Sequence, residues 1–61
     1  MTLAQLETYC SNTIAEHPEL KNEILDLYQL CLDEIDQGES EQNEIYLCQS
    51  SIEELLNDKN K

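Results

Sequence analysis

Three cysteines and one histidine are the residues of this 61-residue chain with the most specific chemistry. Cys10, Cys31 and Cys48 are widely spaced, and His17 stands alone before Pro18. Structural zinc sites use close Cys-x-x-Cys or Cys/His pairs, which the sequence does not contain. An odd number of cysteines without a signal peptide also argues against a disulfide framework. Because cysteine is among the most buried residue types, we expect three reduced core thiols, with no metal and no cofactor.

The segment around Gly38 has part of the spacing of a calcium-binding loop. If Asp33 took the first position of an EF-hand loop, Gly38 would take the sixth and Glu44 the twelfth, as the motif requires. Ile35 and Gln37 would then occupy the third and fifth positions, where oxygen ligands such as Asp or Asn belong. Ile35 also continues the apolar pattern of the preceding segment. We therefore expect a helix end here and no calcium site.

Acidic residues dominate the charge of the chain. Fourteen Asp and Glu residues stand against three Lys, which gives a net charge of −11. Such a chain repels the phosphates of nucleic acids and the anionic surfaces of membranes. No Ser/His/Asp constellation and no Gly-rich phosphate loop can be assembled, so we expect no enzyme. The expected partners are a protein with a basic surface and a second copy of the chain.

The composition favours helices, because the chain has ten Leu, a single Gly, and no Val or Phe. Thr2 and Gln5 have the spacing of a capping box, in which each side chain bonds the backbone of the other residue. Leu3, Leu6 and Cys10 follow at helical spacing. These signals predict a first helix over about residues 3–16.

Pro18 and Gly38 mark the two ends of the second predicted helix. Proline suits the first position of a helix, and glycine suits the left-handed position that follows its last turn. Between them, apolar residues recur at i, i+4, i+7, i+8, i+11 and i+15 from Leu20. The pattern predicts a helix over about residues 18–36.

Ser40 has the position of an N-cap for the third predicted helix. An apolar stripe that begins at Ile45 predicts this helix over about residues 41–57, and the polar segment 58–61 is expected to fray. The sequence thus predicts one all-α domain of three helices over residues 1–61.

The second helix carries apolar residues around an unusually wide arc. At about 100° per residue they span roughly 220°, against about 100° for an ordinary surface helix. Two short neighbours would not cover this arc, and a chain of this size has a marginal core. We therefore expect homodimerisation into a larger helical bundle, although a monomer with a few exposed leucines is the simpler alternative. The residues expected at the partner or dimer interface are Leu25, Leu30, Leu32, Tyr46 and Leu47.

Acidic residues also gather on one side of the second helix. The sequence favours a small regulatory or adaptor protein that binds another protein through apolar and acidic surfaces. The alternative is a DNA mimic that occupies the basic groove of a nucleic-acid-binding protein, and a purely solubilising surface would explain the acidity more simply. The residues of the expected acidic face are Glu23, Asp26, Asp33 and Glu34.

The absence of a signal peptide and of a membrane-length apolar run favours a cytoplasmic location.

Overall fold

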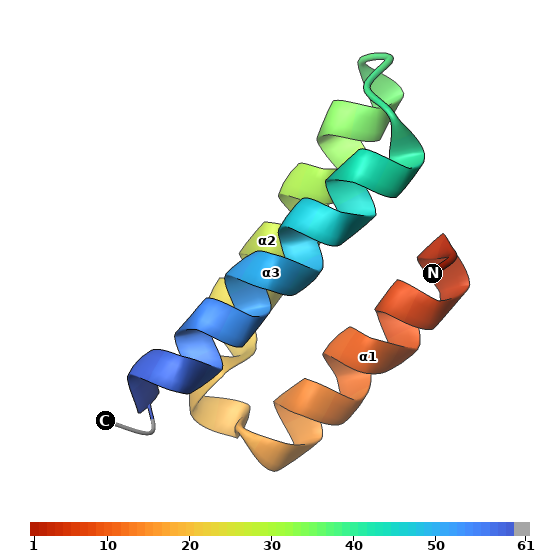
Figure 1. Ribbon diagram of the computed structural model, residues 1–61. Helices are drawn as coiled ribbons and strands as arrows, with labels where there is room; N and C mark the ends of the chain where they lie inside the picture. Colours follow the sequence, from red (N-terminus) through yellow and green to blue (C-terminus); the bar gives the residue numbers. More distant parts are fainter. Residues whose placement is uncertain (60–61) are drawn as a thin grey trace.

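Three α-helices and one short 3-10 turn make up the computed structural model, which describes residues 1–59 (Figure 1). α2 and α3 lie side by side as an antiparallel hairpin, and α1 packs along this pair, with more extensive contact between α2 and α3 than between α1 and α2. The bundle measures 35 × 19 × 19 Å. The prediction of an all-α, three-helix fold is confirmed. The elements are α1 (Leu3–Glu16), η1 (Pro18–Leu20), α2 (Lys21–Asp36) and α3 (Glu41–Lys59).

The predicted capping box forms at the start of α1. The Thr2 hydroxyl accepts a hydrogen bond from the Gln5 N–H at 3.2 Å, and Gln5 Oε1 accepts one from the Thr2 N–H at 2.9 Å. Two of the backbone N–H groups that a helix start leaves unpaired are thereby satisfied. The helix turns Leu6 and Cys10 into the core and ends at Glu16, as the sequence predicted.

The second helix differs from the prediction at its start, where Pro18–Leu20 forms a 3-10 turn rather than α-helix. The Leu20 N–H donates to the His17 carbonyl at 2.9 Å, and the Lys21 N–H donates to the Pro18 carbonyl. Proline has no N–H and a fixed φ, so the chain turns tightly here before the α-helical ladder begins at Lys21. The His17 side chain caps neither helix, and its Nδ1 lies 3.5 Å from Glu19 Oε1.

Gly38 ends α2 in the manner the sequence predicted. Its φ is +103°, in the region that side chains with a Cβ avoid. The Gly38 N–H donates to the Ile35 carbonyl and the Glu39 N–H to the Glu34 carbonyl, each at 3.0 Å. These two bonds form a Schellman motif, which satisfies carbonyls of the last turn and reverses the chain toward α3.

Ser40 caps α3, because its hydroxyl accepts a long hydrogen bond of 3.4 Å from the Asn43 N–H. α3 then continues to Lys59, two residues beyond the predicted end at residue 57. Asp58 and Lys59 are therefore helical, and the remaining part of the tail expected to fray, residues 60–61, lies outside the described residues.

The core contains side chains from all three helices, and each helix contributes one cysteine. Ile35 packs against this core from the last turn of α2. The sequence predicted this helical position and apolar contact for residue 35. The N-terminus is tied to α3 as well, since Gln42 Nε2 donates to the Met1 carbonyl at 3.1 Å. The buried apolar residues are Leu6, Cys10, Ile24, Cys31, Ile45, Cys48 and Ile52.

Candidate functional site

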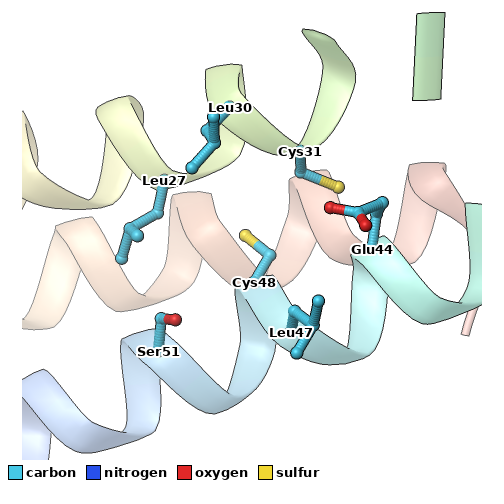
Figure 2. A pocket seen from close by; sticks show the side chains of 7 residues that line it. All are labelled: Leu27, Leu30, Cys31, Glu44, Leu47, Cys48 and Ser51. Atoms are coloured by element: carbon cyan, nitrogen blue, oxygen red, sulfur yellow. The ribbon is translucent and has the colours of Figure 1, made fainter. Parts of the chain in front are cut away.

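A small groove lies between α2 and α3, with a volume of about 110 Å³ (Figure 2). Its walls are formed at spacings of three and four residues along each helix, which place side chains on one side of a helix. The lining is apolar apart from a serine and a glutamate. We call this site the α2–α3 groove. Its lining residues are Leu27, Leu30, Cys31, Glu44, Leu47, Cys48 and Ser51.

The α2–α3 groove faces away from α1. Burial, with the charge of Glu7 from α1 as the next cause, raises the pKa of Tyr28 on α2. Burial, with the charge of Glu53 from α3, likewise raises the pKa of Tyr9 on α1. The first pair locates α1 on the side of α2 that carries Tyr28, and the second shows that α1 also faces α3. Leu30 lies about 160° around α2 from Tyr28. One side of the hairpin is thus covered by α1, and the other side holds the groove.

Two leucines from different helices meet at this groove. Leu30 of α2 is 55% exposed and Leu47 of α3 is 48% exposed, and both line the same groove (Figure 2). Single exposed leucines are common on protein surfaces, whereas contiguous apolar surface is found more often at interaction sites.

The other predicted interface residues lie elsewhere. Leu25 is 44% exposed and sits about 140° around α2 from Leu30. Tyr46 is 66% exposed, about 100° around α3 from Leu47, and Leu32 is partly buried. The five residues therefore do not form one continuous surface, and the structure brings only Leu30 and Leu47 of this set into the groove.

Five of the seven lining residues were not predicted at the interface, although helical spacing relates them to Leu30 and Leu47. Cys31 and Cys48 were expected only as core thiols, and Leu27, which packs against the core, also forms one wall of the groove. Glu44 and Ser51 lie three residues before and four residues after Leu47, which puts them on the same side of α3. Reading the neighbours of Leu47 at helical spacing would have found both.

The predicted acidic face adjoins the groove. On a helix its four carboxylates lie within about 60° of Leu30, two on each side of it. Three of them are exposed and Glu34 is half-buried, while Asp33 Oδ1 accepts a hydrogen bond of 3.1 Å from Gln29 Nε2. Across the groove, Glu44 adds a half-buried carboxylate from α3. The groove is thus an apolar hollow with carboxylates beside it. The carboxylates of α2 are those of Glu23, Asp26, Asp33 and Glu34.

The thiols of Cys31 and Cys48 point into the space between α2 and α3 (Figure 2), and all three cysteines are free and buried. Burial raises the pKa of the Cys48 thiol to about 12, and the neighbouring thiols of Cys10 and Cys31 add to the rise. Burial, followed by the charge of Glu44, raises the pKa of Cys31 as well. Thiols with raised pKa values stay protonated at neutral pH and are poor nucleophiles. The cysteines therefore act here as core residues.

Within residues 1–59, no group of three or more His, Cys, Asp or Glu side chains has an arrangement that would hold a metal ion. In the same part of the chain, no helix has both the length and the apolarity that crossing a membrane requires.

No family model, curated protein or solved structure matches this chain. The case for a function therefore rests on the α2–α3 groove and the carboxylates beside it.

Proposed function

We propose that this protein is a small regulatory or adaptor protein that binds another protein chain at the α2–α3 groove, and that it is not an enzyme. The observation that carries the proposal is the convergence of Leu30 and Leu47, each about half exposed, at one groove. Covering these side chains would remove apolar surface from water, at about 25 cal/mol for each Å². A partner that covers them also adds to the core of a chain so short that its own core is marginal.

The size of the groove supports a protein ligand rather than a small molecule. Small-molecule sites are typically about 300–1,000 Å³, whereas this groove holds about 110 Å³. A volume of that size suits one aliphatic side chain supplied by a larger surface. Binding of this kind uses a few anchor side chains in small pockets, surrounded by contacts that exclude water.

Homodimerisation, like a cytoplasmic location, stays a prediction from the sequence. A dimer would sediment at about twice the chain mass of 7.1 kDa, and Leu30→Glu would return it to the mass of one chain. A species of one chain mass at millimolar concentration would contradict the homodimer while leaving a different protein partner in place.

The alternative function, an inhibitor that mimics DNA, has less support. The observation that supports it is the row of carboxylates on one side of α2. However, Leu30 lies in the middle of that row and lines an apolar groove. A phosphate mimic would bind almost wholly through charge, so its affinity would fall steeply with salt. A complex that survives about 0.5 M salt would exclude mimicry as the principal mode of binding.

Site-specific photo-crosslinking in cells that make the protein tests the proposed function. A photo-reactive amino acid at position 47 should give a discrete adduct with a second polypeptide, because this position lines the groove. The matched control carries the same amino acid at position 25, where Leu25 is similarly exposed but lies on another side of the bundle.

The mass and identity of the adduct then distinguish the outcomes. A specific adduct at position 47 and none at position 25 supports binding at the groove, and an adduct of two chain masses identifies the second copy. Adducts at neither position, or equal adducts at both, would refute the groove as the binding site.

A further inference from the structure

We infer that the occupant of the α2–α3 groove is a basic amphipathic helix of another protein, with aliphatic residues on one side and Lys or Arg on its flanks. This inference rests on the proposed function and adds the chemical class of the partner. It follows from three properties of the groove, which are its position between two helices, its apolar anchor site, and the sign of the charges around it.

The position of the groove favours a helix. Two antiparallel helices present a long furrow, and side-chain ridges of a third helix fit such furrows at interaxial distances of about 8–10 Å. The same hairpin already accepts a helix on its opposite side, where α1 packs against both α2 and α3. An amphipathic helix laid in an apolar groove is also a recurring mode of protein recognition, with anchors at i, i+3 or i+4, and i+7.

The lining of the groove specifies the apolar anchor. Leu27, Leu30 and Leu47 form its walls, and Ser51 and Cys48 leave room between them because their side chains are short. The space of about 110 Å³ admits one aliphatic side chain. A Leu or Ile on the bound helix would fill this space, while the next apolar residues along that helix would cover Leu30 and Leu47.

The charges around the groove specify the flanks of the partner. Glu44 is the charged residue of the lining, and the four carboxylates of the α2 acidic face surround Leu30. Lys21, the cationic side chain of α2, lies about 180° around that helix from Leu30 and does not neutralise them. Lys or Arg residues on both flanks of a bound helix would meet these carboxylates, which favours association and suppresses acidic partners.

The same charges disfavour a second copy at this groove. A two-fold interface brings each surface against itself, so the acidic face of α2 and Glu44 would meet their own copies. Each chain also carries a net charge of −11. Facing like charges across an interface costs binding free energy, whereas a basic helix gains it.

Two synthetic peptides test the inference with the full-length protein. The first, about 18 residues or five turns long, carries Leu at i, i+4, i+7 and i+11 with Lys on both flanks. Its twin has the same Leu residues and Glu in place of every Lys. Fluorescence anisotropy measures the Kd of each peptide for the wild-type protein and for Leu30→Ser, Leu47→Ser and the matched control Leu25→Ser.

The basic peptide is expected to bind, and the acidic twin to bind at least about tenfold more weakly. Because about half of each leucine is exposed before binding, Leu30→Ser and Leu47→Ser should each raise Kd about fivefold, and the double variant about 25-fold. Leu25→Ser should leave Kd within about twofold, and helical circular dichroism checks that each variant is folded.

Failure of the inference is distinguishable from failure of the proposed function. No binding of the basic peptide at about 1 mM, equal binding of both peptides, or an equal loss with Leu25→Ser would overturn the inference. A position-47 crosslink obtained together with any of these results would retain the groove as a protein-binding site and reject only the basic helix as its occupant.

Discussion

Raising the pH is expected to destabilise the fold through the Cys48 thiol. Burial raises the pKa of this thiol from an ordinary value of 9.0 to about 12 in the folded chain. Below pH 9 the thiol is protonated in both the folded and the unfolded states, so its contribution to stability is fully present. Between pH 9 and about 12 the unfolded chain loses a proton that the folded chain keeps, and the free energy of unfolding therefore falls as the pH rises.

The magnitude follows from the pKa difference. One pKa unit corresponds to about 1.4 kcal/mol, so at pH 10 Cys48 alone lowers the free energy of unfolding by about 1.4 kcal/mol. Small proteins unfold in urea with slopes near 1 kcal/mol per molar. The urea midpoint should then fall by about 1.4 M between pH 8 and pH 10 on account of this thiol.

Urea unfolding followed by circular dichroism at pH 8 and pH 10 measures this effect. The matched control is Cys48→Ala, which removes the ionisable group but keeps a small apolar side chain in the core. The other groups whose pKa values are raised by burial remain in both proteins and add destabilisation of the same sign; they are Cys10, Cys31, Tyr9 and Tyr28. The difference between the two proteins isolates Cys48, and an equal loss of stability in Cys48→Ala would refute the reasoning.

Three further predictions concern the fold. Gly38→Ala should lower the free energy of unfolding by about 1–2 kcal/mol, because φ at this position is +103°, whereas Ser11→Ala on the exposed side of α1 should change it by less than about 0.5 kcal/mol. Ile24→Ala, at a fully buried side chain, should cost about 2–5 kcal/mol and its neighbour Leu25→Ala distinctly less; equal losses in thermal unfolding would contradict this difference in burial. Adding about 0.3 M NaCl should raise Tm, because salt screens the repulsion that accompanies a net charge of −11, and a Tm that falls or stays constant would show that this repulsion is not significant.

Local signals explain why the helix boundaries could be predicted from the sequence. Thr2 with Gln5, Pro18, and Gly38 each act within a few residues of the boundary that they define, through a capping box, a fixed φ and a left-handed turn. The 3-10 form of the turn after Pro18 was not predicted. A 3-10 turn is common at the start of an α-helix, and Pro18 is compatible with either form, so the local sequence does not distinguish them.

The candidate site was predictable only in part, because it depends on where α1 packs. Leu30 lies at one edge of the apolar arc of α2 and Leu25 and Leu32 lie at the other, and the sequence alone does not show which edge is covered. α1 packs on the side that carries Tyr28 and leaves Leu32 partly buried, while Leu30 stays exposed beside Leu47. The periodicity of one helix shows how wide its apolar arc is, but only the packing of all three helices shows which part of the arc is covered.

The sharing of the three core cysteines among the three helices provides a kinetic probe of how the bundle opens. An alkylating reagent reacts with a buried thiol only during transient exposure, so the labelling rate at each cysteine reports a local opening equilibrium. α1 contacts α2 less extensively than α3 does. If α1 detaches alone, Cys10 would be labelled faster than a core position that is exposed only in global unfolding. Single-cysteine versions of the chain would thus compare the opening of each helix without an added probe.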